Sequence, residues 1–593
     1  MVETDRRDGA AEQRERRRLH RRVPQVAGVL ALLTGIHDVI GGISPGWHNR
    51  WIEISELVPG AVTDVARTGT VLAGILLLML SHALRRRKRR AWQAAVVLLA
   101  VSIVLHLFRD LLIIESVISA AMLAALLYTR AEFYAVGDPR TRWRALYTGV
   151  LLTAGSLGIG LLFLQLNHRE LTRGYGFTDR WQSVFLGLFG INGPVEFMTD
   201  RRGDLFALVM GGLGLFTALT VVYLFLRPAE PVVALSDEDE RRLRCLLDRQ
   251  GHRDSLGYFS LRRDKSVIWS SSGKACVTYR VVSGVMLAGG DPLGDPEAWP
   301  GAIQEFMAEA DRHAWVPAVM GCSELGAEVW VREGGLDAIE LGDEAFIDVA
   351  EFSLDGRAMR NVRQMVNRVS RQGYQVELKR EKDFTQAELD ALWSQAAAWR
   401  GTDTERGFSM ALGRVGEPGD EECAIATARR NGDLHAFLHF VPWGPDGLSL
   451  DLMRRDRAAQ PGLNDYMIAE AIRLSGDLGV QRISLNFAVF RAVFERGERV
   501  GAGPVLRAWR GLLLFLSRWF QLESLYKFNA KFQPTWRPRF FVYPSLNDAP
   551  RIALAALEAE AFLVWPRLRL PGLLPPPARR RATDVPGPRP SAH

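Results

Sequence analysis

The sequence has few cysteines and lacks the motifs that mark the common cofactor enzymes. Its 593 residues include four cysteines that lie far apart and form no CxxC or Cys/His ligand spacing: Cys245, Cys276, Cys322 and Cys423. We therefore expect reduced, structural thiols and no bound metal. No P-loop, Rossmann fingerprint, HExxH, GxSxG or kinase set occurs. The sequence gives no support to a redox, kinase or serine hydrolase role, and it predicts no cofactor.

The basic residues are gathered in a few segments of the chain. The formal net charge is +7, and arginine and lysine cluster in the tail 1–22, at 85–90, at 130–144 and near the C-terminus. This pattern suits an anionic membrane surface or a polyanionic substrate.

The first part of the chain holds apolar runs that are long enough to cross a bilayer, which needs about 20 residues. A transmembrane domain over 23–228 is predicted, with six spans at 23–44, 60–84, 91–109, 111–129, 145–167 and 204–226. The segment 183–192 is too short to span and is predicted to be interfacial or re-entrant. Because the tail and the even-numbered loops are the basic ones, both termini are predicted to face the cytoplasm of a multi-pass cell-membrane protein.

Polar residues inside the first span are costly and therefore informative. His37 and Asp38 lie in this span, and they indicate either a buried interhelical hydrogen bond or a contact to a lipid headgroup. A second set lies between the third and fourth spans and is interpreted as an interfacial charge network: His106, Arg109, Asp110 and Glu115.

The composition changes after residue 228. Strand-like runs alternate with helical patterns, which predicts an α/β domain. Its length fits two lobes, at 236–350 and 351–565, and the Pro- and Arg-rich tail 566–593 is predicted to be disordered.

One predicted helix, 354–372, carries an arginine stripe. At 100° per residue the stripe occupies an arc of about 140°, with apolar residues opposite; its members are Arg357, Arg360, Arg363, Arg368 and Arg371. A solvated face is the ordinary explanation. Phosphate contact is the alternative, because no acidic residue is interleaved and the arginine fork matches phosphate oxygens.

Two further patterns mark candidate site residues. In the strand 448–453, Asp451 points away from the leucines, and a regular pleat puts Arg454 on the opposite face, so the two share a site only if the strand ends or bulges between them. A surface salt bridge is the other reading of this pair. Lys527 and Lys531 are interleaved with aromatic residues, which suits a phosphate or nucleotide end, although lysines flanking a core element look the same.

These segments resemble the phosphatidylglycerol lysyltransferase family, the aminoacyl-phosphatidylglycerol synthases known as multiple peptide resistance factors. The similar pieces are ordered along the C-terminal part: 259–265 (FSLRRDK), 289–296 (GGDPLGDP), 356–373, 405–410 (ERGFSM), 449–454 (SLDLMR) and 525–536 (LYKFNAKFQPTW). The transmembrane part is similar only in general layout.

The resemblance implies two tandem acetyltransferase-like (GNAT-like) lobes, with aminoacyl-tRNA and phosphatidylglycerol entering from opposite ends of a tunnel between them. It implies catalytic roles for Asp451, Arg454 and Lys531, and substrate binding by Lys527 and Glu523. The expected activity moves an aminoacyl group, lysyl first, onto the lipid glycerol hydroxyl, which alters membrane surface charge and resistance to cationic antimicrobial peptides. The longest members carry extra spans and an appended lysyl-tRNA synthetase that are not seen here, which leaves the transferred amino acid and lipid flipping open.

Two alternatives stay open. An acyl-CoA-dependent N-acetyltransferase on the same lobe type needs a Q/RxxGxG/A turn, and no convincing one is found. A non-enzymatic, membrane-anchored scaffold that binds tRNA or lipid is the other. A homo-oligomer formed through the transmembrane domain is one further hypothesis.

Overall fold

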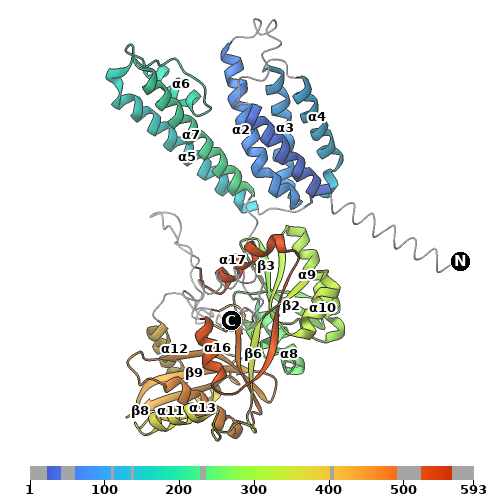
Figure 1. Ribbon diagram of the computed structural model, residues 1–593, viewed down its shortest axis with the longest axis vertical. Coiled ribbons are helices and arrows are strands. Elements are labelled where there is room, and N and C mark those ends of the chain that lie inside the picture. Colours follow the sequence, from blue (N-terminus) through green and yellow to red (C-terminus); the bar gives the residue numbers. More distant parts are fainter. Residues whose placement is uncertain are drawn as a thin grey trace, which may run out of the picture.

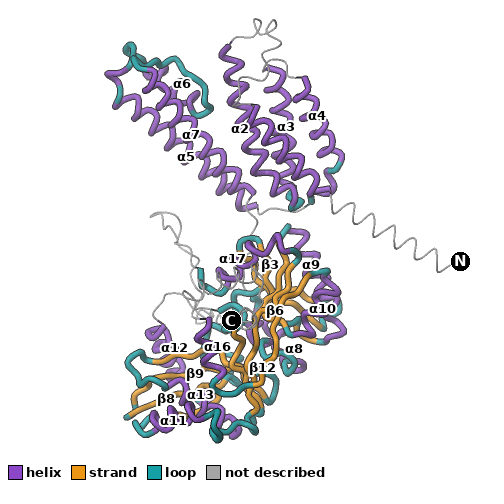
Figure 2. The backbone as a smooth tube through the Cα atoms, in the orientation of Figure 1, coloured by secondary structure: helices purple, strands orange, loops and turns teal. Residues whose placement is uncertain are grey.

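The computed structural model describes residues 23–41, 60–108, 113–134, 139–226, 235–400, 407–489 and 522–563. We call residues 23–226 the helical half and residues 235–563 the C-terminal half. Figures 1 and 2 show helices in the first and strands gathered in the second.

Within its described residues, the helical half contains five helices that are long and apolar enough to cross a membrane, at Val23–Gly41, Thr68–Arg85, Arg89–His106, Ala145–Leu166 and Asp200–Phe225. The elements after the first helix are α2 (Gly60–Arg85), α3 (Arg89–Phe108), α4 (Ile113–Tyr128), η2 (Arg130–Glu132), α5 (Pro139–Leu166), η3 (His168–Glu170), α6 (Phe177–Gly187) and α7 (Asp200–Leu226). A helix satisfies its own backbone groups, which hydrocarbon cannot do, so apolar runs of this length fold as helices.

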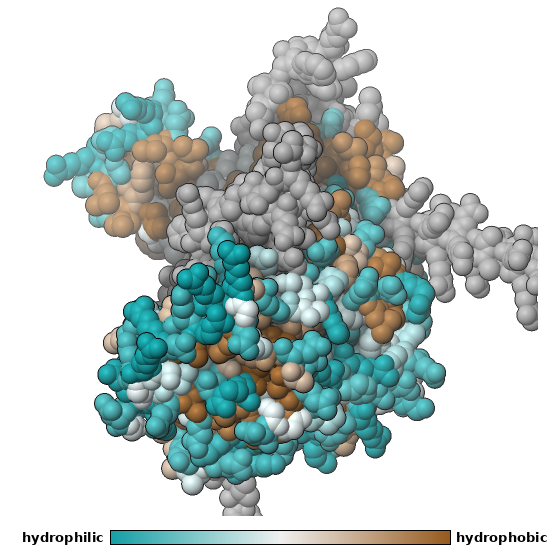
Figure 3. Space-filling view, turned by 60° about the horizontal axis from the view of Figure 1, so that its bottom comes forward, coloured by the Kyte–Doolittle hydropathy of each residue, from teal (hydrophilic) through white to brown (hydrophobic). Residues whose placement is uncertain are grey.

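Large apolar side chains point outward from these helices. Leu166 and Leu208 are each 73% exposed, as expected where the surrounding solvent is lipid. Figure 3 shows the contrast, with broad apolar surface on the hairpin of α5 and α7 (upper left) and a mostly hydrophilic C-terminal half. A multi-span helical membrane domain is therefore confirmed.

Two of the predicted membrane segments are short in the structure. The fourth predicted span appears as α4, whose 16 residues cover about 24 Å at 1.5 Å per residue, less than a hydrocarbon core of about 30 Å. The count of six spans thus stays a prediction. The segment predicted to be interfacial overlaps α6, which has 11 residues and packs through Val184 into a cluster with Met210 of α7.

Asp38 points into the helix bundle rather than towards lipid. It is 1% exposed, and its Oδ1 lies 3.4 Å from Nε2 of the equally buried His106 on α3. This contact supports the interhelical interpretation of Asp38, whereas His37 is exposed. The predicted network around His106 falls partly outside the described residues, which include neither residues 109–110 nor the side chain at position 115.

The C-terminal half is built on one sheet of 12 strands in the order β1-β2-β3-β5-β12-β6-β11-β10-β9-β8-β7, with β4 paired to β2. The strands are β1 (Ser266–Trp269), β2 (Ala275–Val282), β3 (Val285–Gly289), β4 (Leu293–Gly294), β5 (Val316–Cys322), β6 (Asp337–Asp348), β7 (Gln375–Arg380), β8 (Ala424–Arg430), β9 (Asp433–Pro442), β10 (Gly447–Arg455), β11 (Arg482–Val489) and β12 (Thr535–Tyr543).

Helices cover this sheet. They are α8 (Asp237–Gln250), η4 (Gly257–Leu261), η5 (Pro296–Ala298), α9 (Trp299–His313), α10 (Glu324–Gly334), α11 (Arg360–Ser370), η6 (Glu381–Asp383), α12 (Gln386–Arg400), α13 (Leu463–Ser475), η7 (Gly476–Leu478), α16 (Leu522–Ala530), η8 (Leu546–Asp548) and α17 (Ala549–Ala559). Local signals set their ends: Ser323 caps α10 by accepting a hydrogen bond from the Gly326 N–H, and Gly335 ends it at a φ of 63°.

β12, from near the end of the described chain, connects strands β1 to β5 with strands β6 to β11 in the sheet. β12 lies between β5 and β6 and pairs antiparallel with both, and α17 packs into the cluster that holds β2, β3 and β5 residues through Ile552 and Ala555. The α/β fold class is confirmed. The division into lobes at 236–350 and 351–565 stays a prediction, with β12 and α17 returning to the strands of the first range.

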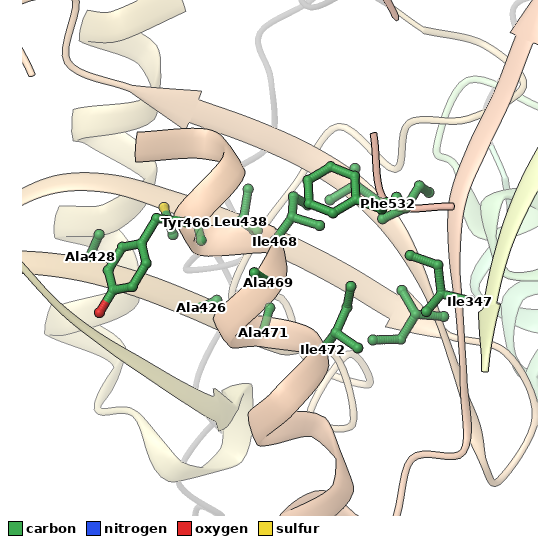
Figure 4. Close-up of a cluster of buried hydrophobic side chains, with 14 of the residues drawn as sticks. Ile347, Ala426, Ala428, Leu438, Tyr466, Ile468, Ala469, Ala471, Ile472 and Phe532 are labelled. Atoms are coloured by element: carbon green, nitrogen blue, oxygen red, sulfur yellow. The ribbon is translucent and has the colours of Figure 1, made fainter. Parts of the chain in front are cut away.

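A cluster of buried apolar residues holds α11 and α13 against β7 to β11. Ile468, Ala469 and Ile472 of α13 meet Leu438 on β9, and Phe532 closes the cluster (Figure 4). Each fully buried side chain of the size of leucine or phenylalanine contributes about 1.5–3 kcal/mol. This packing fixes strands β9 and β10, on which the site is built.

Candidate functional site

A β-bulge on β10 turns Asp451 out of the regular pleat. The β9–β10 register runs from Leu450 opposite Phe440 to Leu452 opposite His439, and it shifts between Leu450 and Leu452. The bulge that the sequence analysis required is therefore present. The Asp451 side chain is only 3% exposed, so the alternative of a surface salt bridge with Arg454 is wrong.

Asp451 belongs to a buried triad with His439 and Glu381. Nδ1 of His439 lies 2.6 Å from Oδ2 of Asp451, and Nε2 lies 2.9 Å from Oε1 of Glu381. The remaining carboxylate oxygens accept backbone N–H groups: Leu412 donates to Asp451 at 2.6 Å, and Gly416 donates to Glu381 at 3.0 Å. Both carboxylates are thus held in one orientation.

The triad determines the charge of its central histidine. Burial alone lowers the pKa of His439, but hydrogen bonds to Asp451, Cys423 and Glu381 outweigh it and raise this pKa well above its ordinary value. A protonated ring donates from both nitrogens, which suits two carboxylate acceptors.

The same pocket brings together atoms of metal-binding type. Ligand atoms of Glu381, Cys423 and His439 lie within 4.8 Å of one another, and all three residues are buried. The direct bond between His439 and Glu381 and the raised pKa of the histidine favour a protonated ring, which cannot ligate a metal through Nε2. Burial also raises the pKa of the Cys423 thiol to about 11, which favours a neutral thiol.

Arg454 lies three residues beyond Asp451 on β10, opposite Phe437. Its Nη1 donates to the Met453 carbonyl at 3.2 Å. The ion pair that the structure gives Asp451 is the one with His439.

Lys531 follows the end of α16 and pairs with an acid on α13. Its Nζ lies 2.7 Å from Oδ1 of Asp465 and 5.1 Å from the centroid of the Phe528 ring. The Lys531 side chain is 44% exposed, which leaves it accessible to a substrate. Lys527 is exposed on α16, and Glu523 lies on the same helix with its side chain outside the described residues.

The arginine stripe is real, but its helix is shorter than predicted. α11 begins at Arg360, because Gly356 adopts a φ of 84° and residues 357–359 form a turn. Arg363 donates to the Leu354 and Gly356 carbonyls at 2.5 and 3.3 Å, so it braces this turn. The other four arginines are exposed and form no ion pair with any residue that the structure describes. Figure 1 places α11 at the end of the C-terminal half farthest from the helical half.

Comparison with known proteins identifies the chain. The family described as phosphatidylglycerol lysyltransferase, C-terminal, matches residues 244–543, and the family described as transmembrane region of lysyl-tRNA synthetase matches residues 19–223. The chain belongs to the phosphatidylglycerol lysyltransferase family.

Curated relatives of this lysyltransferase family include lysylphosphatidylglycerol biosynthesis bifunctional protein LysX of Rhodococcus jostii, 40% identical over 93% of this chain and 50% of that protein. LysX of Mycobacterium tuberculosis is 49% identical over 60% of this chain and 30% of that protein. The chain thus spans half or less of these relatives. The solved structure of L-PGS from Bacillus licheniformis is 22% identical and covers 56% of this chain and 98% of that chain, with a TM-score of 0.48.

The family motifs that are separate in sequence meet around a lysine that the sequence analysis did not select. Lys265 is 1% exposed, and its Nζ lies 4.7 Å from the centroid of the Phe408 ring. A Cβ at Gly289 would stand 3.2 Å from this Nζ. Burial, with Arg262 nearby, lowers the pKa of Lys265 to about 7. Residues of the FSLRRDK, GGDPLGDP and ERGFSM motifs therefore enclose one amine.

A buried ionic network connects β12 and β6 with the loop before η4, and Asp291 of the GGDPLGDP motif lies beside it. Arg539 of β12 lies 2.8 Å from Oδ1 of Asp254 and bonds Glu344 of β6. Burial, with Asp254 nearby, raises the pKa of Asp291 to about 7. This network braces the junction of β5, β6 and β12.

Proposed function

We propose that this chain transfers an aminoacyl group, lysyl first, from aminoacyl-tRNA to the glycerol hydroxyl of phosphatidylglycerol. The observation that carries the proposal is the bulge at Asp451, which holds a buried, oriented carboxylate within a sequence that matches the lysyltransferase family. Membership of that family favours this activity over the acetyltransferase and the scaffold.

The reaction needs no further activation, because the aminoacyl ester of tRNA is already reactive. The lipid hydroxyl oxygen attacks the ester carbonyl, the bond to the tRNA ribose oxygen breaks, and the proton of the hydroxyl ends on that ribose oxygen. The protein must orient two large substrates, hold the proton during transfer and stabilise the oxyanion.

Three side chains, Asp451, Lys531 and Arg454, are assigned to the chemical step, and others position them or bind substrate. Asp451 accepts the hydroxyl proton and passes it to the leaving oxygen, while His439 and Glu381 keep its carboxylate fixed. Lys531 and Arg454 provide positive charge for the oxyanion or a substrate phosphate. Lys527 and Glu523 bind substrate beside Lys531, and the exposed arginines of α11 bind tRNA phosphates.

The proposed topology puts the chemistry on the cytoplasmic side, with both termini there. Arg86, in the basic loop between α2 and α3, pairs with Asp548 of the C-terminal half at 3.0 Å, so that loop and the C-terminal half lie on the same side. Reporter fusions at residues 88 and 235 should both report cytoplasm. A periplasmic signal at 235 would remove tRNA from reach.

Transfer of a lysyl group changes the charge of the lipid. Phosphatidylglycerol is an anion, whereas its lysyl ester carries two added ammonium groups, so the product weakens the attraction of cationic peptides to the surface. Resistance to cationic antimicrobial peptides is the proposed consequence.

The decisive experiment supplies the full-length protein, in phosphatidylglycerol vesicles, with total tRNA charged with labelled amino acids. We expect label in the lipid fraction, mainly from lysine. Label transferred only from acetyl-CoA to an amine would favour the acetyltransferase. Binding of tRNA and lipid without any transfer would favour the scaffold.

A further inference from the structure

Cations from both halves of the molecule meet where the loop between α2 and α3 touches the start of α17. Nη2 of Arg86 lies 3.0 Å from Oδ1 of Asp548. One turn later, Arg551 donates from Nε and Nη2 to the carbonyl of Ser283, at 3.1 and 2.8 Å, in the turn between β2 and β3. Figure 1 shows α17 at the end of the C-terminal half nearest the helical half.

Among the described residues, three basic side chains repel one another at this junction. Arg86, Lys88 and Arg551 are all partly buried there, and Asp548 is the only acid that Arg86 or Arg551 contacts among the described residues. Burial, with Arg551 and Arg86 nearby, lowers the pKa of Lys88 to about 8. Burial, with Arg86 nearby, lowers the pKa of Arg551 to about 10, although Asp548 opposes this. An anion placed among the three would relieve their repulsion.

Two exposed leucines lie near the cations. Leu546 is 74% exposed and Leu554 is 48% exposed, and Leu554 lies three residues after Arg551, on the same side of α17. Exposed leucines beside cations, next to helices that cross the bilayer, suit an anionic lipid headgroup with its acyl chains alongside. tRNA offers phosphates but no apolar surface, and the arginines of α11 lie at the opposite end.

We propose that Arg86, Lys88 and Arg551 form a binding site for the phosphodiester group of an anionic phospholipid in the adjoining leaflet. The site holds the headgroup where lipid passes from the bilayer to the C-terminal half. The proposal that lipid binds here is argued from the contacts at the junction alone. Only the further role, presenting phosphatidylglycerol as the acceptor of the aminoacyl group, rests on the proposed function.

The test measures lipid binding by the full-length protein in neutral detergent, using native mass spectrometry with short-chain phosphatidylglycerol, phosphatidylcholine and inorganic phosphate as separate probes. Wild type should prefer phosphatidylglycerol to phosphatidylcholine. Arg551→Gln and Lys88→Gln should each weaken phosphatidylglycerol binding about fivefold, the worth of one basic residue near an anionic surface. The matched control Arg249→Gln, at an exposed position on α8, should leave binding unchanged.

The acidic partner distinguishes a lipid site from a structural brace. Asp548→Asn removes the competing negative charge, so phosphatidylglycerol binding should be equal or tighter. If Asp548→Asn weakens binding as Arg551→Gln does, the junction is only a brace and the proposal fails. Equal binding of both lipids by every variant, or inorganic phosphate binding in place of lipid, would also overturn it.

Failure of the proposed function gives a different pattern. If no variant or wild type transfers label to lipid, but phosphatidylglycerol binding keeps the predicted ranking, the site stands and the transferase assignment falls. If wild type transfers label but the variants do not show the predicted ranking of phosphatidylglycerol binding, the transferase assignment stands and the lipid site falls. Lys88→Gln changes a loop residue outside the sheet, so it keeps the test valid if Arg551→Gln does not fold.

Discussion

Replacing His439 with glutamine tests the buried triad. His439 makes two charge-assisted contacts, at 2.6 and 2.9 Å, with no solvent exposure. Removing one member of a buried ionic set costs about 3–5 kcal/mol, because the remaining charges lose their compensation. We therefore expect His439→Gln to lower the free energy of unfolding of the C-terminal half by about that amount near neutral pH.

The pH dependence of this loss has a definite sign. The folded protein raises the pKa of His439, so it binds the proton more tightly than the unfolded chain does. The stability that protonated His439 contributes is complete below the pKa of about 6.5 in the unfolded chain. It disappears as pH rises through the raised pKa of His439 in the folded protein. The difference in free energy of unfolding between wild type and His439→Gln should therefore be largest at pH 6 and should decrease towards alkaline pH.

The assay is pulse proteolysis of the full chain in mild detergent, across urea concentrations, at pH 6 and pH 9. His435→Gln is the matched control, because His435 lies on the same strand and contacts the Tyr374 ring instead of a carboxylate. If His439→Gln and His435→Gln show the same pH dependence, the triad does not hold a charged imidazole.

Three further predictions address the remaining site residues. Arg360→Glu and Arg368→Glu should each reduce the slope of log affinity for tRNA against log salt by about 0.7–0.9, whereas Arg363→Gln should not, because Arg363 is bonded to backbone carbonyls; filter binding at several salt concentrations measures this. Lys531→Ala should lower single-turnover transfer by about 10²–10³, and an unchanged rate would remove Lys531 from the site. Because the folded pKa of Asp291 is raised to about 7, the stability linked to its proton is lost as pH rises from about 4 through 7. Asp291→Asn should flatten that part of the pH–stability curve, and an unaltered curve would contradict the assignment.

The sequence predicted which strand carries the central carboxylate of the site, but not the residues that contact this carboxylate. The alternation in 448–453 identified Asp451 as the odd residue, and it made a site shared with Arg454 conditional on the strand ending or bulging. The structure contains a register shift between Leu450 and Leu452. The sequence did not identify His439 or Glu381. His439 reaches Asp451 through the pairing of β9 with β10, and Glu381, which contacts His439, is 58 residues away from it in the sequence. A histidine inside an apolar strand was the available signal.

Backbone conformation and chain return explain other differences. The period of apolar residues predicted the arginine face of α11 correctly, but the positive φ of Gly356 delays the helix to Arg360. β12 contains Pro538, which usually marks an edge strand, so no local feature indicates that it is inserted between β5 and β6. Such long-range pairing depends on the whole sheet rather than on any one segment.

The most direct test of the account compares wild type with Asp451→Asn in lysyl transfer from charged tRNA to phosphatidylglycerol, using folded full-length protein at saturating tRNA. The account predicts labelled lysyl-lipid from wild type and a rate lower by about 10²–10⁴ for Asp451→Asn, the worth of positioned acid–base catalysis. Near wild-type turnover by a folded Asp451→Asn protein would contradict the role of Asp451. No lipid product from wild type, with any charged tRNA, would contradict the activity itself.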